Sequence, residues 1–262
     1  MIFVRLSGGL GNQIFQFGFA LLIREGLNNN STIVLDCSGL GNYKVKRNFT
    51  LNKFFKLEEF KVVSRPLISR FRLPKIFPCK YLITDKNAKA ALIKPSSNCI
   101  LDGYFQDCLD QKSFNEIRTL LLKYFRSDLF DNKTHIGELH FHIRGGDFLD
   151  LGFSGPSQIN YYKKAILVAK NFSDYKHVNV FTDDLDFTKS FIKELNLNSD
   201  IYSSSLVDDF VGLSCCNFVV SSSSTFSFWA LALSPNEFRV IFPSEWTPGR
   251  PRNILLPGEV IL

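Results

Sequence analysis

The sequence contains no run of about 18 apolar residues, so we expect no membrane-spanning helix. It also lacks a basic leader with a long apolar stretch behind it, which argues against a secretory signal and favours a cytosolic location. The six cysteines form no C-x-x-C pair, and the four histidines show no metal-ligand spacing. We therefore expect reduced thiols and no structural zinc site.

The net charge of +6 is too small to indicate a nucleic-acid partner. The chain of 262 residues is 45% hydrophobic and 21% charged, which is typical of a folded globular protein. The charge is unevenly distributed, because residues 44–94 hold fourteen basic and three acidic residues, whereas the remainder holds seventeen basic and twenty-two acidic ones. Residues 44–94, the basic segment, thus differ from an otherwise acidic chain.

Strand-like and helical patterns alternate along the chain, which predicts an α/β fold with parallel sheets. We expect strands at 2–6, 31–36, 100–105, 138–143, 178–182, 201–202, 218–221 and 238–242, and helices at 12–27, 112–125, 158–171 (capped by Ser157), 185–195, 208–215 and 225–233. The basic segment contains three prolines and is expected to be irregular. A boundary near 127–137 would give two α/β halves, 1–132 and 133–262.

Four polar clusters follow predicted strands, at residues 8–13, 142–147, 182–184 and 221–225. In an open parallel sheet, ligands bind beyond the carboxyl ends of the strands. Because the clusters are shared between both halves, they predict a cleft between two facing sheets.

The first cluster, Gly8-Gly9-Leu10-Gly11-Asn12-Gln13, joins a strand to a helix. Its glycines would let the backbone approach a ligand, and the N–H groups of the helix would face an anion. It is equally consistent with a tight turn that binds nothing. A third interpretation is a dinucleotide fingerprint, Gly9-x-Gly11-x-x-Ile14 with Asp36 after it, which would indicate an NAD(P)-dependent oxidoreductase. The third glycine of that fingerprint is missing.

The clusters of the second half suit a phosphorylated ligand. Arg144 offers a fork of donors to phosphate oxygens, and His142 would point the same way from the same strand. The alternative is a surface Arg–Asp pair beside a buried histidine. Asp183 and Asp184 could bind Mg²⁺, cap the next helix or accept hydrogen bonds from a base or sugar. The hydroxyl groups of 221–227 could bind an anion at a helix N-terminus or form an ordinary cap.

Six ordered motifs run through both halves: GGLGNQIFQFGFA (8–20), LDGYFQ (101–106), HIRGGDF (142–148), FTDD (181–184), SSTFSFW (223–229) and VIFPSEW (240–246). Together they resemble those of glycosyltransferase family 11, the bacterial α-1,2-fucosyltransferases that use GDP-fucose. The resemblance implies a GT-B architecture of two Rossmann-like halves that face a central cleft. Residues 1–132 would then bind the acceptor and residues 133–262 the GDP-sugar.

The resemblance further implies inverting, metal-independent transfer of L-fucose from GDP-β-L-fucose to a galactose-type hydroxyl of a bacterial surface glycan, with no cofactor. Arginine, backbone N–H groups and helix dipoles would then neutralise the departing diphosphate. By resemblance, Arg144 would hold the diphosphate, and Asp147 is a candidate base that could instead hold its own loop together. The other implied donor contacts are Gly11, Asn12, Gln13, His142, Asp183, Ser224, Thr225 and Ser227.

One position departs from the family pattern, because Gly145 stands where the family has a second arginine. The motif therefore carries one positive charge fewer. Either a basic residue elsewhere compensates, or use of the donor is slower or altered. A further alternative is an inactive protein that only binds a GDP-sugar.

The basic segment lies in the half that would bind the acceptor, and phenylalanines alternate with its basic residues. One interpretation is a solvated basic face over a Phe-rich core. The other is peripheral contact with the anionic inner face of the cytoplasmic membrane, where a lipid-linked glycan acceptor would be found. Each lysine or arginine near such a surface contributes on the order of 1 kcal/mol.

Overall fold

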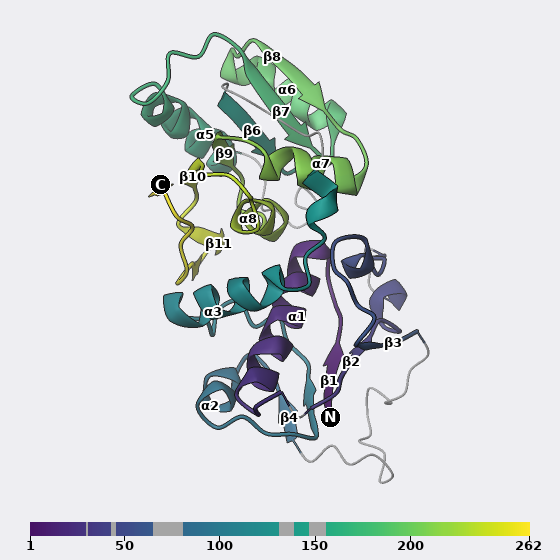
Figure 1. Ribbon diagram of the computed structural model, residues 1–262. Helices are drawn as coiled ribbons and strands as arrows, with labels where there is room; N and C mark the ends of the chain where they lie inside the picture. Colours follow the sequence, from purple (N-terminus) through teal and green to yellow (C-terminus); the bar gives the residue numbers. More distant parts are fainter. Residues whose placement is uncertain (30, 43–45, 65–80, 131–138, 147–155) are drawn as a thin grey trace. The chain divides into compact units, whose positions relative to one another are not determined.

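The computed structural model describes residues 1–29, 31–42, 46–64, 81–130, 139–146 and 156–262. The chain divides into two units, Met1–Arg126 (unit 1) and Ser127–Leu262 (unit 2) (Figure 1). Each unit contains a parallel sheet with helices packed on it, so the predicted α/β class with two Rossmann-like halves is confirmed. The predicted cleft, and the assignment of acceptor and donor to the two halves, stay predictions.

Unit 1 is built on a five-stranded parallel sheet with the order β3-β2-β1-β5-β4. Its elements are β1 (Ile2–Arg5), α1 (Leu10–Glu25), β2 (Ile33–Asp36), the 3₁₀ turns η1 (Leu40–Asn42) and η2 (Leu51–Lys53), β3 (Lys61–Val63), β4 (Tyr81–Ile83), α2 (Ala88–Ile93), β5 (Cys99–Leu101) and α3 (Gln111–Leu122). The strand order reverses between β1 and β5. The loops that follow these two strands therefore lie at the switch point, where parallel sheets bind ligands.

The basic segment is more regular than its sequence predicts. The expectation of an irregular segment is wrong for β3, β4 and α2, which lie inside it. β3 and β4 have three residues each and lie at the two edges of the sheet, so they are too short to show a two-residue periodicity. Their pairing with neighbouring strands, rather than local sequence preference, defines them.

The described part of the basic segment buries its aromatic residues and exposes its lysines. Phe55 and Phe60 pack edge-on against Phe17 of α1, with ring centroids 5.6 Å and 5.0 Å away. Lys53 and Lys56, in the same stretch, are exposed. This arrangement agrees with a solvated basic face over a Phe-rich core.

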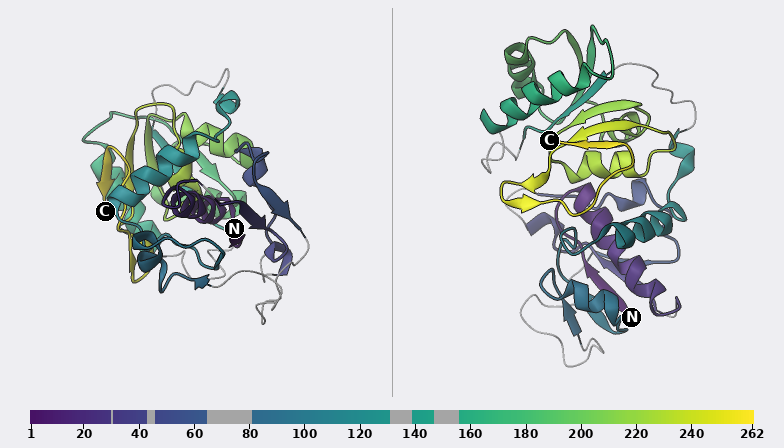
Figure 2. Two further views of the ribbon diagram at one scale, coloured as in Figure 1. Left: turned by 60° about the horizontal axis from the view of Figure 1, so that its bottom comes forward. Right: turned by 90° about the vertical axis from the view of Figure 1, so that its left-hand side faces the viewer.

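Unit 2 contains a six-stranded parallel sheet with the order β13-β10-β9-β6-β7-β8. Its elements are η3 (Ser127–Phe130), β6 (Leu139–Ile143), α5 (Pro156–Ala169), β7 (Val178–Thr182), α6 (Leu185–Leu195), β8 (Ser199–Tyr202), α7 (Leu206–Ser214), β9 (Phe218–Ser221), α8 (Thr225–Ala232), β10 (Arg239–Phe242), β11 (Glu245–Thr247), β12 (Arg250–Pro251) and β13 (Glu259–Ile261). This is the doubly wound Rossmann order, and it reverses between β6 and β9. Helices α5 and α6 cover one face of the sheet, and α7 and α8 cover the other (Figure 2).

Capping residues explain where the helices of unit 2 begin. Asp184, Ser205 and Ser224 each accept a hydrogen bond from a backbone N–H in the first turn of α6, α7 and α8. The predicted cap at Ser157 is wrong, because α5 begins one residue earlier, at Pro156. Proline is favoured at the first helical position, since its missing N–H has no partner there in any case.

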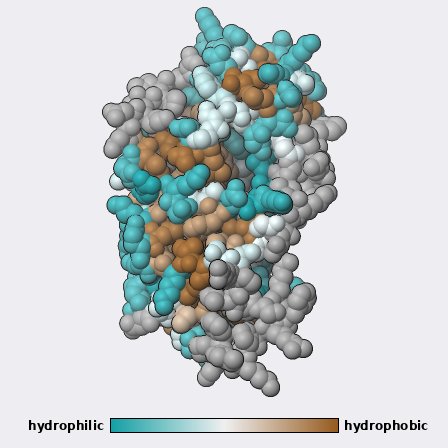
Figure 3. Space-filling view, turned by 90° about the vertical axis from the view of Figure 1, so that its right-hand side faces the viewer, coloured by the Kyte–Doolittle hydropathy of each residue, from teal (hydrophilic) through white to brown (hydrophobic). Residues whose placement is uncertain are grey.

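Some apolar side chains remain at the surface. The face drawn in Figure 3 shows apolar patches separated by hydrophilic residues. Among the described helices, none is long and apolar enough to cross a membrane.

Five cysteines in the described part of the chain are free thiols, and burial raises the pKa of Cys108 to about 12. Cys79 lies outside the described residues.

The packing of α1 on α3 gives a test of the core of unit 1. A Cβ atom added at Gly18 would lie 2.4 Å from Cγ2 of Ile117, so the two helices need a glycine at this crossing. We expect Gly18→Ala to lower the free energy of unfolding by about 1–2 kcal/mol in urea titration, because overpacking outweighs the gain in helix propensity.

Two further variants test the cause of that loss. Ile117→Leu moves the branch of the side chain away from Gly18 and should recover part of the stability of Gly18→Ala. The control is Gly41→Ala, since a Cβ there meets no atom within 4 Å. Equal losses at positions 18 and 41 would contradict the packing argument.

Candidate functional site

Three strands of unit 2 end side by side and bring together the polar clusters that follow them. In the register of the sheet, His142 of β6 is paired with Ser221 of β9, and Ile143 with Thr182 of β7. Residues 142–146, 182–184 and 221–225 therefore share one edge of the sheet, at its switch point. Asp147, the candidate base, lies outside the described residues.

The loop after β6 is held by the two aspartates that follow β7. Oδ2 of Asp183 lies 2.5 Å from Nη1 of Arg144, and its Oδ1 accepts a hydrogen bond of 2.9 Å from the N–H of Gly145. Oδ2 of Asp184 accepts a further bond of 3.2 Å from the N–H of Gly146. A guanidinium has five N–H donors in a planar fork, which suits it to bind a carboxylate and a phosphate together. The aspartates thus orient Arg144 for an anionic ligand.

Gly145 is a glycine for a steric reason. A Cβ atom at this position would lie 2.6 Å from Cβ of Asp184 and 3.0 Å from a ring carbon of Phe187. A side chain here would push against the first turn of α6 and disturb the loop of Arg144. The substitution Gly145→Arg would therefore change the packing together with the charge, so it cannot isolate the effect of the missing arginine.

His142 is buried and neutral beside this loop. Its Nδ1 lies 2.9 Å from Oγ of Ser222, its ring stacks on Phe226 at 5.9 Å, and its carbonyl accepts a 2.5 Å hydrogen bond from the hydroxyl of Tyr162. Burial, aided by the charge of Arg144, lowers the pKa of His142 to about 3. Contact of His142 with a nucleotide stays a prediction. In this structure His142 links β6 to the start of α8.

The N-terminus of α8 is capped by its own serines. Oγ of Ser224 accepts a hydrogen bond from the N–H of Phe226, so the interpretation of this run as an ordinary cap is confirmed. The hydroxyl of Ser227 is fully buried and bonded to Ser221 and to the carbonyl of Ser224. Thr225, the first residue of α8, is partly exposed. Binding of a nucleotide by Ser224, Thr225 and Ser227 stays a prediction, and the burial of Ser227 favours an indirect role for it.

The glycine-rich loop of unit 1 is a tight turn that its own side chains support. Gln13 is fully buried, donates to the carbonyls of Gly8 and Asn48, and accepts a bond from the N–H of Thr50. Gly8 has a φ of +74°, and a Cβ there would lie 2.4 Å from Nδ2 of Asn12. Gly11 lies inside α1, which begins two residues before the predicted start. Contacts of Gly11, Asn12 and Gln13 with a ligand stay predictions.

Two polar residues of unit 1 that sequence reasoning did not single out join the loops at its switch point. Gln16 accepts a bond from the N–H of Ser7 and donates to its hydroxyl and to the carbonyl of Gly103. Asp85 accepts bonds from the N–H groups of Tyr104 and Phe105. Both loops lie in motifs that the sequence carries, but the roles of Gln16 and Asp85 depend on partners far away in the chain.

Phe105 shows the effect of these contacts on the backbone. It is a buried non-glycine residue with a φ of +62°, and its ring stacks on Phe19 at 4.3 Å. Such a backbone conformation persists only where the surrounding structure holds it, as the carboxylate of Asp85 does here.

The strand order defines unit 2 as a doubly wound α/β unit of the Rossmann type, with an oriented arginine and a serine-capped helix at its switch point. The chain belongs to glycosyl transferase family 11, whose family model matches residues 1–249. The resemblance seen in the sequence is thus confirmed. The family match gives no support to the NAD(P)-dependent alternative. Asp36 of that fingerprint accepts a hydrogen bond from the N–H of Ser38.

Two relatives from Escherichia coli match over nearly their full length. The O-antigen biosynthesis glycosyltransferase WbnK is 27% identical, with 95% of this chain and 96% of the relative covered. An alpha-1,2-colitosyltransferase is 25% identical, with 94% and 92% covered. The protein is accordingly a glycosyltransferase related to enzymes of O-antigen synthesis.

The fold is similar to that of solved glycosyltransferases. The crystal structure of POFUT1 in complex with GDP-fucose superposes with a TM-score of 0.52 at 12% identity, and covers 92% of this chain and 97% of the other. A structure of POFUT1 in complex with GDP gives a TM-score of 0.51. The predicted GT-B-like fold class is therefore confirmed.

The buried state of His142 predicts how stability depends on pH. Its pKa of about 3 lies below the value of about 6.5 in an unfolded chain, so the unfolded state binds more protons between these values. The protein should therefore lose stability as the pH falls below about 6.5, by up to about 1.4 kcal/mol per pH unit from this group. We expect His142→Asn to show a shallower loss in urea titrations from pH 7 to pH 4.5. Parallel curves for the two proteins would contradict the assignment.

Proposed function

We propose that the protein transfers L-fucose from GDP-β-L-fucose, with inversion and without a metal ion, to form an α-1,2 linkage on a galactose-type hydroxyl of a bacterial surface glycan. Membership of family 11 and the full-length match to the E. coli relatives support this proposal. GDP-colitose is the second candidate donor, because one of these relatives is a colitosyltransferase. Colitose lacks one hydroxyl group of L-fucose, and both candidate donors are GDP-sugars.

The observation that carries the proposal is the position of Arg144 directly after β6, at the edge of the sheet where His142 contacts the start of α8. A diphosphate leaving group develops negative charge as the sugar–oxygen bond breaks. A guanidinium fixed by Asp183 and the positive end of a helix dipole can stabilise that charge without first having to reorganise. Inversion requires the acceptor hydroxyl to attack from the opposite side of the sugar, and Asp147 is the proposed base for that step.

Assays with a panel of donors test the proposal. We expect GDP-fucose to be hydrolysed slowly without an acceptor, and its fucose to be transferred to lactose, with rates that EDTA does not change. UDP-sugars and NAD(P) should neither react nor raise the melting temperature. Arg144→Ala should lower kcat at least about 100-fold, as loss of one donor to a developing anion does elsewhere.

The matched control is Arg239→Ala. Arg239 begins β10, at the amino-terminal end of the strands and so away from the candidate site, and its guanidinium stacks over Phe172 at 4.2 Å. Its loss should leave kcat unchanged. Thermal stabilisation by GDP-fucose with neither hydrolysis nor transfer would favour the inactive GDP-sugar-binding alternative, and a preference for GDP-colitose would redefine the donor.

We also propose that the basic segment gives the enzyme peripheral contact with an anionic membrane that carries a lipid-linked acceptor. The exposed lysines Lys86, Lys89 and Lys94 support this proposal, since they lie in or next to α2, which ends at Ile93, and the exposed fraction of Ile93 is 86%. Basic residues next to an exposed apolar side chain are a combination that binds the interface of anionic bilayers.

Co-sedimentation with liposomes that contain anionic phospholipid tests this contact. Binding should be strong at low salt, decrease with rising salt, and fall at least about tenfold when Lys86, Lys89 and Lys94 are replaced by Glu. The control replaces the exposed Lys163, Lys189 and Lys193 of unit 2 by Glu, which changes the net charge equally. Equal effects of the two triple variants, or no binding at low salt, would reject the proposal.

A further inference from the structure

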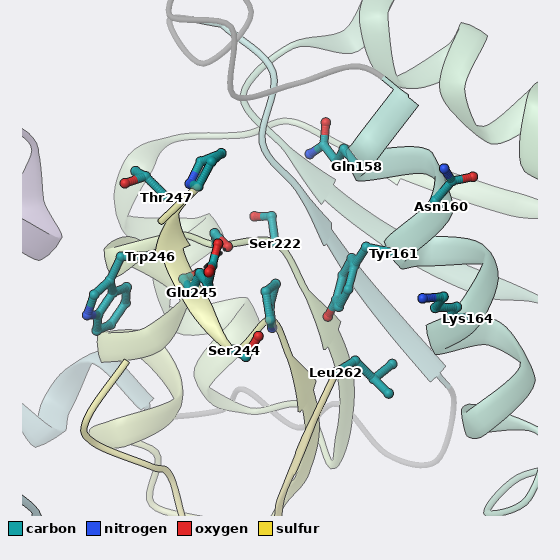
Figure 4. A pocket seen from close by; sticks show the side chains of 13 residues that line it. Gln158, Asn160, Tyr161, Lys164, Ser222, Ser244, Glu245, Trp246, Thr247 and Leu262 are labelled. Carbon is teal, nitrogen blue, oxygen red and sulfur yellow. Dashed lines mark hydrogen bonds between the residues drawn. The ribbon is translucent and has the colours of Figure 1, made fainter. Parts of the chain in front are cut away.

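Unit 2 contains a pocket that none of the predicted donor-binding residues lines. Its volume is about 300 Å³, and it lies between α5 and the ends of β9 and β10 (Figure 4). Arg144, Asp183 and Ser224 are absent from its lining. A volume of this size is at the lower end of the range for small-molecule sites and suits one or two sugar units.

One wall of the pocket is fixed by Tyr161 of α5. Its hydroxyl lies 2.8 Å from the carbonyl of Ser221 and 3.0 Å from the carbonyl of Ile241, so the ring spans the ends of β9 and β10. Burial raises the pKa of Tyr161 well above its ordinary value, so the phenol stays neutral. The side chain therefore offers an apolar ring of fixed orientation, while its polar end is already bonded.

The opposite wall is the β11–β12 hairpin, which is anchored from behind. The hydroxyl of Ser223 donates a 2.7 Å bond to the carbonyl of Glu245, and the buried ring of Trp246 packs edge-on against Phe228 at 5.1 Å. The N–H of Arg252 donates to the carbonyl of Ser244, and its guanidinium forms a buried ion pair with Glu259. The pocket is thus formed by elements held in place without a ligand.

The charges around the pocket indicate the kind of ligand. Among the described residues that line it, the charged side chains are one cation, Lys164, and one anion, Glu245, so these two charges cancel. No arginine is among the described lining residues to offer a phosphate its fork of donors, and a metal ion would need several carboxylates. Asn160 and Lys164 are exposed one turn apart on α5, and both offer hydrogen-bond donors. An apolar ring with hydrogen-bonding groups of both kinds around it matches a neutral pyranose.

We propose that this pocket binds a neutral pyranose unit of the acceptor glycan, so that unit 2 contributes to recognition of the acceptor as well as the donor. The acceptor part of this inference rests on the proposed function. The pocket is connected to the donor edge through two short links. Ser222, which lines it, is bonded to His142, and Gln158 donates a bond to the carbonyl of Arg144.

The two tryptophans of the chain provide a direct test. Trp246 belongs to the hairpin wall of the pocket, with its buried ring packed behind that wall, whereas Trp229 lies in α8 and is absent from the described lining. Their two indole N–H signals in ¹⁵N-labelled protein can be assigned with Trp246→Phe and Trp229→Phe. We expect lactose or a methyl pyranoside of galactose, glucose, mannose or an N-acetylhexosamine to shift the Trp246 signal saturably, with millimolar affinity, while the Trp229 signal stays in place.

A matched pair of surface variants links that shift to the pocket. Asn160→Ala combined with Lys164→Ala should weaken sugar binding at least fivefold, and should raise KM for the acceptor in transfer assays. Hydrolysis of GDP-fucose should be unchanged. Lys163→Ala, one residue away but outside the lining, should leave sugar binding as it is.

Other ligands separate the alternatives. Saturation by methyl α-L-fucopyranoside alone would assign the pocket to the donor's sugar and overturn the acceptor proposal. A shift with GDP or inorganic phosphate alone, or none with any sugar up to tens of millimolar, would overturn it too. If the protein binds a sugar in this pocket but neither hydrolyses GDP-fucose nor transfers its fucose, the proposed function would be contradicted and the sugar-binding pocket supported.

Discussion

The ion pair between Asp183 and Arg144 is the interaction on which the candidate site depends. It joins the ends of β7 and β6, and the second oxygen of the same carboxylate also fixes the N–H of Gly145. The contact is possible only because these strands are parallel neighbours in register. It also requires close approach of the loop to α6, which is why position 145 has no room for a side chain. The charge that would meet a diphosphate is thus fixed by the sheet itself.

In the described part of this loop, Arg144 is the cation, and it is oriented by the neighbouring carboxylate of Asp183. His142, two residues before it, is kept uncharged by burial. At the start of α8, the hydroxyl of Ser221 donates a hydrogen bond to that of Ser227, and the hydroxyl of Ser224 caps the helix. A second charge in the loop would have to overcome the desolvation that already lowers the pKa of His142. The arginine that Gly145 replaces would also have to fit against Asp184 and the ring of Phe187. Electrostatics and packing therefore agree on a loop with one arginine.

Much of the fold could be predicted from the sequence wherever local pattern and tertiary structure agree. β7, α6 and β9 have the predicted bounds, because buried strands read as apolar runs and Asp184 marks the start of a helix. The strands β3, β4 and β11 could not be predicted, since each has three residues and is defined by its partner strand. The same holds for side chains. Arg144 stood out by its motif, whereas Gln16 and Asp85 hold loops more than fifteen residues away and have no local signal.

Unit 2 thus presents two neighbouring surfaces of different chemistry. The edge formed by β6, β7 and the start of α8 holds an arginine oriented by a carboxylate and the positive end of a helix dipole, a combination that suits a diphosphate. The pocket beside α5 balances one lysine with one glutamate around a fixed aromatic ring, which suits a neutral sugar. A glycosyltransferase must stabilise a leaving diphosphate and position an uncharged hydroxyl near it. Ser222 and Gln158 line the pocket and bond to His142 and Arg144, so two hydrogen bonds connect the two surfaces.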